Sequence, residues 1–377
     1  MSTSLYIHIP FCKRRCYYCA FYSTTDLRRR DRYTDALCHE MALRPTGDTV
    51  DTVYIGGGTP SQLTTAQTSR LLEAVKRSYR LAADAEVTIE VNPDDVTAAF
   101  AASLSAMPIA VNRVSMGAQT MDDERLRQIG RRHDARQVVQ AVDRLRSAGI
   151  GNISVDLMYG LPGQTVAEVA HDVGRVLSLG VEHVSAYCLM VEEGTALYDK
   201  MLKDADSTSG CDDGEEMERA MYELICDRLA AAGYEHYEIS NFARPGYRSR
   251  HNSSYWHDTA YVGLGAAAHS YSPAQHTRSW NTADLHAYID SIEQGQLPCE
   301  REHIDGDTHY NDLVTTALRT SDGLCLDMLS DRHRRYCLGE ARTFLASGLL
   351  RLDGQRLVLT RRGLFLSDMV MSGLMLV

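Results

Sequence analysis

Several features that would place a chain in a specialised class are missing from this sequence. Ten cysteines in 377 residues are too few for a disulfide scaffold. Basic residues are outnumbered by acidic ones, 39 to 50, so the formal net charge is −11. This balance argues against general nucleic-acid binding, which needs an excess of lysine and arginine to neutralise phosphates.

Long hydrophobic runs are also missing. No apolar stretch reaches the ~18 residues that a membrane span requires, and residues 1–6 show no charged segment followed by an apolar one, as a secretory signal would. The apolar end of the chain, residues 364–377, is interrupted by Asp368 and is expected to form a final helix packed on the core. We therefore expect a cytoplasmic protein, and in that reducing compartment clustered cysteines tend to form metal or redox sites.

What the first half of the chain does contain is a regular alternation of apolar strands and helical patterns. The strands are predicted at residues 5–9, 52–56, 87–91, 112–115, 153–158 and 184–189, with helices at 61–79, 136–148 and 166–179. Repeated strand–helix units indicate parallel pairing with helices on the outside. Six units predict an α/β fold built on a partial (β/α)6 barrel, in which chemistry collects after the C-terminal ends of the strands.

The second half has a different pattern. Residues 203–216 are polar and acidic and are predicted to form an exposed loop. The helix after it carries a stripe expected to be core, made of Met217, Met221, Leu224, Ile225 and Leu229. Further helices and a hairpin turn at Asp353–Gly354 predict a small, mainly helical, winged-helix-like domain. We predict a barrel domain over residues 1–235, a histidine- and aromatic-rich segment over 236–300 and the C-terminal domain over 301–377.

Three cysteines follow directly after the first predicted strand, in the spacing CxxxCxxC at Cys12, Cys16 and Cys19. Three thiolates from one loop can hold three irons of a 4Fe–4S cluster, which leaves the fourth iron without a protein ligand. A chelating molecule with an amino and a carboxylate group can occupy that open corner. Structural zinc is the alternative, but it needs a fourth ligand, and the nearby His8 lies inside the strand.

This spacing is the signature of the radical S-adenosylmethionine (SAM) superfamily, which the chain resembles. The segment Tyr6-Ile7-His8-Ile9-Pro10-Phe11-Cys12 is similar to the branch that contains coproporphyrinogen III dehydrogenases and heme chaperones. Motifs of this branch recur in the same order over almost the entire chain. The resemblance implies a 4Fe–4S cluster, SAM as its partner and a flavodoxin- or ferredoxin-type electron donor.

The resemblance also implies a SAM pocket formed by residues that follow successive strands. A Gly-Gly-Gly-Thr-Pro loop follows the second strand, where missing Cβ atoms let the backbone approach a ligand closely. Glu90, at the end of the third strand, can accept hydrogen bonds from the ligand, and Arg131 can pair with its carboxylate. Each polar residue alone also fits a helix cap or a surface contact. The implied pocket consists of Tyr6, Gly57, Gly58, Thr59, Glu90, Gln119, Arg131 and Asp156.

Three features favour a heme chaperone over a coproporphyrinogen III dehydrogenase. Phe21 stands where the dehydrogenases carry a further cysteine. The first strand starts almost at Met1, so we expect no N-terminal extension like theirs. The segment His251-Asn252-Ser253-Ser254-Tyr255-Trp256 matches the HNxxYW motif of the chaperones. We therefore expect a protein that passes heme to respiratory proteins, and the membrane surface is one candidate place for this transfer. A coproporphyrinogen III dehydrogenase is the alternative.

The HNxxYW motif supplies the candidate heme residues. Neutral imidazole is an axial ligand of heme iron, which makes His251 the candidate ligand. Tyr255 and Trp256 offer flat apolar surface for a porphyrin. The alternative is a histidine that only packs and has both ring nitrogens satisfied, with Trp256 as a core residue. Nearby substitutes for the iron ligand are His257 and His269, and candidates for the heme propionates are Arg244, Arg248 and Arg250.

Basic residues near the cysteine triplet stand out against the acidic chain. They form a solvated face or a docking surface for an acidic electron donor; they are Lys13, Arg14, Arg15, Arg28, Arg29, Arg30 and Arg32. The remaining cysteines show no ligand spacing and are predicted to be structural; they are Cys38, Cys188, Cys211, Cys226, Cys299, Cys325 and Cys337. The sequence leaves the oligomeric state open, as well as SAM cleavage and covalent attachment of heme.

Overall fold

Six parallel strands form the centre of a large sheet in the computed structural model, which describes residues 2–205 and 214–376. They are β1 (Ser2–Ile9), β2 (Thr49–Gly57), β3 (Arg80–Val91), β4 (Arg113–Gln119), β5 (Asn152–Tyr159) and β6 (His183–Cys188). Strands that follow each other in the chain are neighbours in the sheet, and each pair is parallel. The predicted α/β class and its strand–helix alternation are confirmed.

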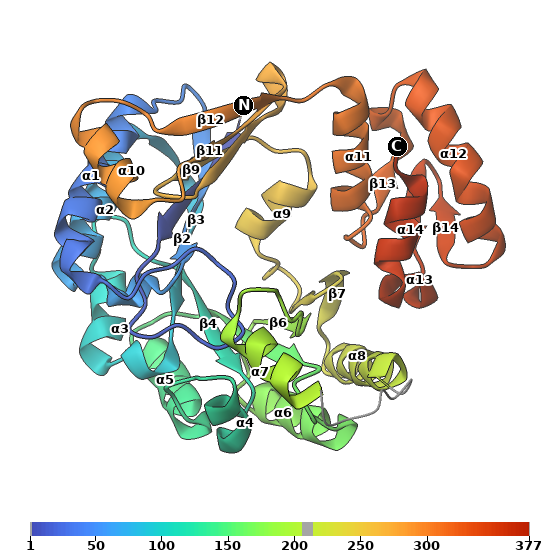
Figure 1. Cartoon of the computed structure of the whole chain (residues 1–377), viewed down its shortest axis with the longest axis horizontal. Helices are drawn as coiled ribbons and strands as arrows, with labels where there is room; N and C mark the ends of the chain where they lie inside the picture. The colour runs from blue at the N-terminus through green and yellow to red at the C-terminus, as the bar shows by residue number, and fades with distance from the viewer. Residues whose placement is uncertain (1, 206–213, 377) are drawn as a thin grey trace.

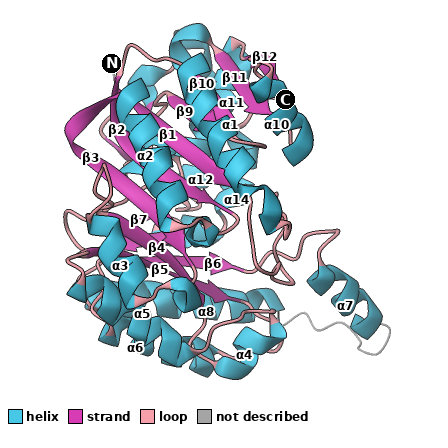
Figure 2. Cartoon of the chain, turned by 90° about the vertical axis from the view of Figure 1, so that its left-hand side faces the viewer, coloured by secondary structure: helices cyan, strands magenta, loops and turns pink. Residues whose placement is uncertain are grey.

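Helices cover the outer face of these strands (Figure 2). They are α1 (Arg30–Leu43), α2 (Thr65–Ser78), α3 (Ala98–Ser105), α4 (Asp123–Gln128), α5 (Ala135–Ser147) and α6 (Val166–Ser178). Three of them, α2, α5 and α6, start with a capping box. In this motif the N-cap side chain and the side chain three residues later satisfy each other's backbone N–H groups, which fixes where the helix begins.

The two faces of the parallel strands differ in chemistry. In β1, Leu5, Ile7 and Ile9 are fully buried in the main hydrophobic core with apolar side chains of the outer helices. Because successive side chains point to opposite faces, Tyr6 and His8 point to the inner face. We call the inner side of the strands the lumen. The polar side chains that lie together there include Tyr6, Tyr54, Glu90, Ser115, Asp156 and Tyr187.

Six further strands extend the sheet beyond both ends of the parallel block. Next to β6 lie β8 (Asn241–Ala243) and β7 (Glu235–Glu238), and next to β1 lie β9 (Tyr261–Leu264), β10 (His269–Ser272), β11 (Thr277–Asn281) and β12 (Cys299–His303). Of these, β9 pairs in parallel with β1, whereas β10, β11 and β12 are antiparallel. The helix α10 (Leu285–Glu293) packs on α1. None of these six strands was predicted from the sequence.

The acidic segment predicted as a loop is helical at both ends. Helix α7 (Ala196–Ala205) runs into it and α8 (Gly214–Ala231) starts within it, while residues 206–213 lie outside the described residues. In α8 the stripe predicted as core is wrong at Met217, which is 43% exposed, because the buried positions begin only at Met221. The other stripe residues are buried or packed against the core.

The C-terminal elements enclose a second hydrophobic cluster (Figure 1). They are α11 (Gly306–Ala317), β13 (Leu324–Cys325), α12 (Asp331–Ala346), β14 (Leu350–Asp353), β15 (Arg356–Leu359), α13 (Arg361–Phe365) and α14 (Ser367–Leu374). The hairpin turn and the final core-packed helix are confirmed. Arg319 joins this part to the barrel through the buried Glu238, with Nη2 2.8 Å from Oε1. Among the described helices, none combines the length and the apolar character needed to cross a bilayer.

Candidate functional site

The cysteine triplet lies on the loop that leaves the C-terminal end of β1. Cys12 is buried, and Cys16 and Cys19 are half-buried. The loop is fixed by backbone hydrogen bonds, including Cys12 N–H to Thr24 O at 2.9 Å. Burial raises the pKa of the Cys12 and Cys19 thiols. Within the described residues, no group of three or more His, Cys, Asp or Glu side chains is arranged to hold a single metal ion.

A chain of side-chain contacts joins two of the cysteines to the ends of the neighbouring strands. The Cys12 thiol is hydrogen-bonded to the Thr59 hydroxyl at 3.4 Å, and Asn92 Nδ2 donates to the same hydroxyl at 3.3 Å. Arg131 donates to Asn92 Oδ1 at 2.7 Å and to Cys16 Sγ at 3.5 Å. The structure therefore brings Thr59 and Arg131 together with the cysteines. Asn92 was missed, although it stands two residues after Glu90 and just before a strand-ending proline.

Arg131 has hydrogen-bonding capacity to spare. One Nη also donates to Gly117 O at 2.5 Å, but the buried Nε–H has no partner among residues 2–205 and 214–376. A buried N–H without an acceptor is costly, so the site fits a ligand that brings one. Beside it, Gln119 has a positive φ of 70°, an uncommon backbone conformation for a residue with a side chain. A Cβ on Gly117 would lie 2.6 Å from Gln119 Nε2, so the chain is tightly folded at this strand end.

Two carboxylates face the lumen just below the cysteine loop. Tyr54 donates its hydroxyl hydrogen to Glu90 Oε1 at 2.7 Å, and Gly57 N–H donates to Oε2 at 3.0 Å. Burial, and secondly the charge of Asp156, raise the pKa of Glu90 to about 7 despite these bonds. Burial likewise raises the pKa of Asp156 to about 6, and Ser115 Oγ lies 3.4 Å from its carboxylate. Two such groups favour a ligand that donates hydrogen bonds or carries positive charge.

The glycine loop after β2 is constrained by the protein itself. Gly57 has a φ of +113°, and a Cβ there would lie 2.6 Å from the His8 ring. A Cβ on Gly58 would lie 2.8 Å from the backbone of Pro10. Packing against β1 and the start of the cysteine loop thus already requires both glycines. Tyr6, the remaining predicted SAM residue, is hydrogen-bonded to His8 Nδ1 at 3.0 Å and points into the lumen.

The HNxxYW motif forms α9 (Arg250–Trp256), which packs against β2. His251 is 1% exposed, with Nδ1 2.7 Å from Thr52 Oγ1 and Nε2 2.8 Å from the Tyr255 hydroxyl. Burial lowers the pKa of His251 to about 3, so the imidazole is neutral. Both ring nitrogens are engaged within the protein. Trp256 is half-buried and packs on Tyr237, with ring centroids 5.9 Å apart.

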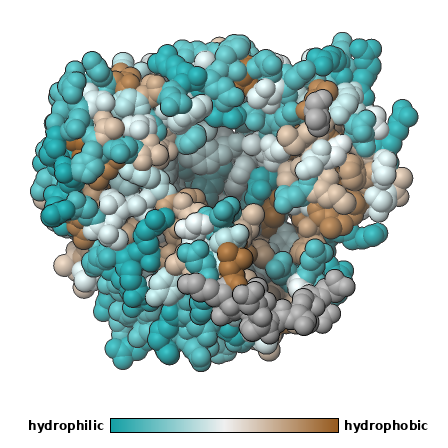
Figure 3. Space-filling view, in the orientation of Figure 1, coloured by the Kyte–Doolittle hydropathy of each residue, from teal (hydrophilic) through white to brown (hydrophobic). Residues whose placement is uncertain are grey.

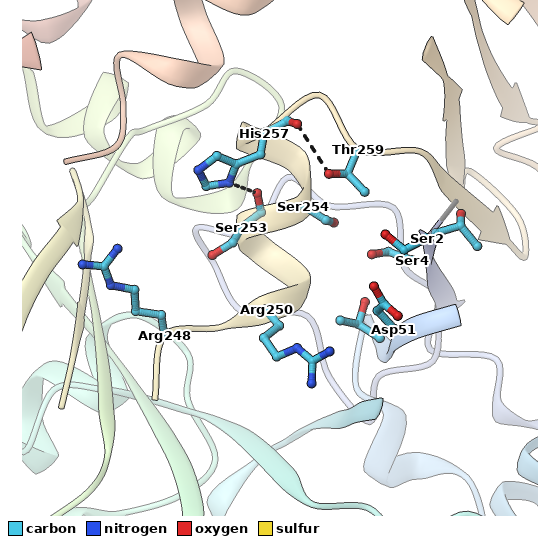
Figure 4. Close-up of a pocket in the computed structure, with 11 residues that line it drawn as sticks. Ser2, Ser4, Asp51, Arg248, Arg250, Ser253, Ser254, His257 and Thr259 are labelled. Atoms are coloured by element: carbon cyan, nitrogen blue, oxygen red, sulfur yellow. Dashed lines mark hydrogen bonds between the residues drawn. The ribbon is translucent and has the colours of Figure 1, made fainter. Parts of the chain in front are cut away.

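Behind α9 lies a polar cavity of about 290 Å³ (Figure 4). The space-filling view is hollowed near the centre of this face, close to α9 (Figure 3). The cavity is lined by Ser2, Thr3, Ser4, Asp51, Thr52, Arg248, Arg250, Ser253, Ser254, His257 and Thr259. Seven of these eleven residues carry hydroxyl groups, so the walls do not provide the apolar faces that a porphyrin ring needs.

The other predicted heme contacts also have protein partners. Arg250 pairs with Asp84 at 3.2 Å, Arg248 pairs with Glu235 at 3.0 Å, and Arg244 lies over the Tyr234 ring. His257 and His269 are on the surface; the first pairs with Asp322 at 3.2 Å and the second stacks on Trp280. None of these side chains lies with the cysteine loop.

The basic residues around the cysteine loop divide into two kinds. Most pair with carboxylates, as Lys13 does with Asp95 at 2.7 Å. Arg14, Arg15 and Arg30 instead donate to backbone carbonyls. Arg15 Nη2 donates to Cys19 O at 3.3 Å, so its charge lies beside a cysteine. The cysteines predicted to be structural lie elsewhere in the fold, and Cys211 lies outside the described residues.

The chain is similar to known proteins both in sequence and in structure. Residues 6–176 match the radical SAM superfamily and residues 304–366 match the HemN C-terminal domain. The chain is 35% identical to heme chaperone HemW of Bacillus subtilis, over 97% of both chains, and 36% identical to heme chaperone HemW of Mycobacterium tuberculosis, over 98% of this chain and 94% of the relative. The solved structure of coproporphyrinogen III oxidase (HemN) from Escherichia coli superimposes with a TM-score of 0.84 at 25% identity, over 99% of this chain and 89% of that one.

Proposed function

Because the chain belongs to the heme chaperone HemW family of the radical SAM superfamily, we propose that it holds a 4Fe–4S cluster, binds SAM and carries heme to respiratory proteins. One observation carries the proposal: contacts through Thr59, Asn92 and Arg131 join the cysteine loop to the strand ends around the lumen. We also propose that the protein works in the cytoplasm with an acidic flavodoxin- or ferredoxin-type donor, which Arg14 and Arg15 would attract.

In this proposal Cys12, Cys16 and Cys19 are the cluster ligands. The cluster and SAM, when bound, supply one-electron reductive chemistry. Burial raises the pKa of Cys12, and the Thr59 hydroxyl and the Arg131 charge partly offset this effect, so these two side chains favour the thiolate form that binds iron. The Thr59–Arg131 network also fixes the orientation of the loop.

The proposed SAM pocket lies at the end of the lumen next to the cysteine loop, which we call the mouth. The unpartnered Arg131 Nε–H fits a carboxylate, and the buried pair of Glu90 and Asp156 fits ribose hydroxyls or an ammonium group. Tyr6, Gln119 and the loop at Gly57, Gly58 and Thr59 complete the pocket. These side chains bind and orient the ligand and exclude water from it.

For heme we retain His251 as the proposed iron ligand, with Tyr255 and Trp256 beside the porphyrin. Nε2 can reach iron only if it gives up its 2.8 Å bond to Tyr255. Two substitutions test this role: His251→Ala should abolish stoichiometric heme binding, whereas Tyr255→Phe frees Nε2 and should leave heme affinity equal or higher. Heme binding that survives in His251→Ala would move the ligand elsewhere, and His257→Ala and His269→Ala would be the next variants.

A second candidate function is oxygen-independent coproporphyrinogen III dehydrogenation, which the structural similarity to HemN favours. Against it, position 21 holds a phenylalanine, 73% exposed, in place of a further thiol. An anaerobic assay with SAM, reductant and coproporphyrinogen separates the two functions. Rapid formation of protoporphyrinogen would establish the dehydrogenase.

The experiment that tests the main proposal is anaerobic purification followed by iron, sulfide and heme titration on one sample. About four iron and four sulfide per chain are expected, with one heme bound per chain. Zinc without labile sulfide would overturn the radical SAM assignment of the cysteine loop. A full cluster without heme binding would overturn the chaperone function alone.

A further inference from the structure

Helix α9 packs on the N-terminal part of β2 through the contact of His251 with Thr52, whereas the cysteine loop leaves the C-terminal end of β1. We call α9 the floor. Glu86 on β3, which is buried, anchors the start of the helix: it accepts the backbone N–H groups of Arg250 at 3.1 Å and His251 at 3.0 Å. The Ser249 side chain caps the same turn by accepting Asn252 N–H. The position of the His251 backbone is therefore fixed relative to the barrel strands.

The His251 side chain is fixed as firmly as its backbone. Thr52 and Tyr255 hold the two ring nitrogens in hydrogen bonds. The flat face of the imidazole stacks on Tyr54, with centroids 4.8 Å apart and planes inclined by 23°, and more distantly on Tyr6 at 6.4 Å. The neutral, immobile ring of His251 thus forms one wall against Tyr54.

Tyr54 is held from a second side by the backbone. A Cβ on Gly56 would lie 2.7 Å from Tyr54 Cε1 and 2.9 Å from Glu90 Oε1. The phenol ring is therefore clamped between the chain at Gly56 and the His251 imidazole. In this position its hydroxyl donates to Glu90 Oε1 at 2.7 Å. The orientation of the Glu90 carboxylate therefore depends on the Tyr54 ring, which is in turn held in place by His251 on α9.

We propose that His251 is a positioning residue for the SAM pocket, acting through its stack on Tyr54 and the hydrogen bond from Tyr54 to Glu90. The inference rests on the proposed function, because it takes SAM as the ligand of Glu90. It assigns the histidine of the HNxxYW motif a role that does not require heme. Heme at Nε2 would disturb the Tyr255 bond and, through the same ring, would alter the SAM pocket.

Two substitutions at His251 separate stacking from hydrogen bonding. His251→Phe keeps a flat ring against Tyr54 but loses both hydrogen bonds, whereas His251→Asn keeps a polar partner for Thr52 but loses the stack. Neither supplies an imidazole to iron, so a role in heme ligation alone affects both variants equally. Positioning through the stack predicts that only His251→Asn disturbs SAM binding.

His183 provides a matched control. It is also 1% exposed, and both of its ring nitrogens are engaged, with Ser154 at 2.7 Å and Tyr237 at 2.7 Å. It lies on β6, and its ring neighbour is Tyr237 rather than Tyr54. Like His251→Asn, His183→Asn therefore removes a buried histidine with both ring nitrogens bonded. Unlike His251→Asn, it leaves the contacts of Tyr54 and Glu90 unchanged.

The measurement is SAM affinity by anaerobic calorimetry on chains with a full iron and sulfide complement. We expect His251→Asn to bind SAM about tenfold more weakly, as for a lost or misdirected hydrogen bond to a charged group. His251→Phe and His183→Asn should stay within about threefold of the unsubstituted protein, which corresponds to less than one such hydrogen bond. The calorimeter reads binding and not turnover, so a defect in electron supply does not affect the result.

A pH series of the same affinities gives a readout that general destabilisation does not move. Tyr54 donates to Glu90, and this bond opposes the effect of burial on the Glu90 pKa. Loss of the bond in His251→Asn raises the pKa of Glu90. As the pH is lowered, Glu90 then takes up its proton at a higher pH, so the SAM affinity should begin to fall at a higher pH than in the unsubstituted protein. The groups that face Glu90, namely Tyr6, Tyr54, Tyr255 and Asp156, are the same in every variant.

The outcomes separate this inference from the function on which it rests. An unsubstituted protein with a full cluster that binds no SAM overturns the proposed function and the inference together. SAM binding that is normal in His251→Asn overturns the inference and leaves the proposed function in place. Equal weakening in His251→Asn, His251→Phe and His183→Asn also overturns it, because general loosening of the barrel then explains the effect.

Discussion

The two ends of the lumen are built on different principles. At the mouth, Arg131 Nε–H has no partner among the described residues, and burial raises the pKa of Glu90 to about 7. At the floor, both nitrogens of His251 are bonded and Glu86 accepts two backbone N–H groups. Unsatisfied buried groups cost stability unless a ligand pairs with them. A ligand can therefore lower the energy of the mouth, whereas His251 and Glu86 already have partners. On β3 and β4, Thr88 Oγ1 and Arg113 Nε are also buried without a partner in the described chain.

The largest effect is expected from removing one of the proposed cluster ligands at the mouth. Cys16→Ala removes one of three thiolate ligands and should abolish the brown absorbance of the cluster after anaerobic reconstitution, because the described part of this loop has no cysteine besides Cys12, Cys16 and Cys19 that could replace it. Cys38→Ala, on α1, is the matched control and should reconstitute fully. A cluster spectrum that persists in Cys16→Ala would place the ligands elsewhere.

The next effect concerns Glu90. Glu90→Gln keeps the shape of the side chain but removes its charge, and SAM affinity should fall by at least about tenfold. Ser115→Ala, beside Asp156, should have a smaller effect because its contacts with that carboxylate are long, at 3.4 and 3.5 Å. Calorimetric titration of both variants with SAM provides the comparison, and unchanged affinity in Glu90→Gln would remove this residue from the pocket.

Glu90 should also make the ligand-free protein sensitive to pH. Its pKa in the folded chain, about 7, lies above its usual value of 4.5, so the native state binds the extra proton between these values. The stability that this gives is complete below about pH 4.5 and is lost as the pH rises through about 7. The Tm of the unsubstituted protein should therefore fall relative to that of Glu90→Gln between pH 5 and 8, by about 2–4 °C. Parallel Tm curves would show that Glu90 titrates normally.

A smaller effect tests the floor. Glu86→Gln replaces one of the two acceptor oxygens by an NH2 group, so one of the two N–H groups that begin α9 loses its acceptor. The free energy of unfolding should therefore fall by about 1–3 kcal/mol. Asp84→Asn is the control, since this carboxylate is 83% exposed and its pair with Arg250 contributes at most about 1 kcal/mol. Denaturant titration measures both. Equal losses in the two variants would mean that Glu86 does not anchor the floor.

Local patterns were enough to predict the barrel strands. The apolar stretch at residues 5–9 was predicted to be the first strand, and the structure places β1 at Ser2–Ile9. The order of motifs along the chain placed Thr59, Glu90 and Arg131 after successive strands, where parallel pairing brings such ends together. The strand predictions succeeded because each depends on a few neighbouring residues, whereas the role of Thr59, Glu90 and Arg131 in a SAM pocket stays a prediction.

What the sequence analysis missed depends on long-range pairing. The parallel pairing of β9 with β1 joins residues more than 250 positions apart, and no local pattern records it. The partners of His251 were likewise invisible, because Thr52 belongs to β2 and meets the histidine only when α9 packs on β2. The choice between a packed histidine and an iron ligand depended on those partners. Asn92 was overlooked because an amide at a strand end also fits an ordinary turn.

The most direct test of the account is the electron paramagnetic resonance spectrum of the reduced, reconstituted protein with and without SAM. A cluster held by Cys12, Cys16 and Cys19 has one iron open to the ligand, so SAM should change the spectrum, and the change should be weaker in Glu90→Gln. A spectrum identical with and without SAM would contradict the account, because the cluster would then have no open corner at the mouth.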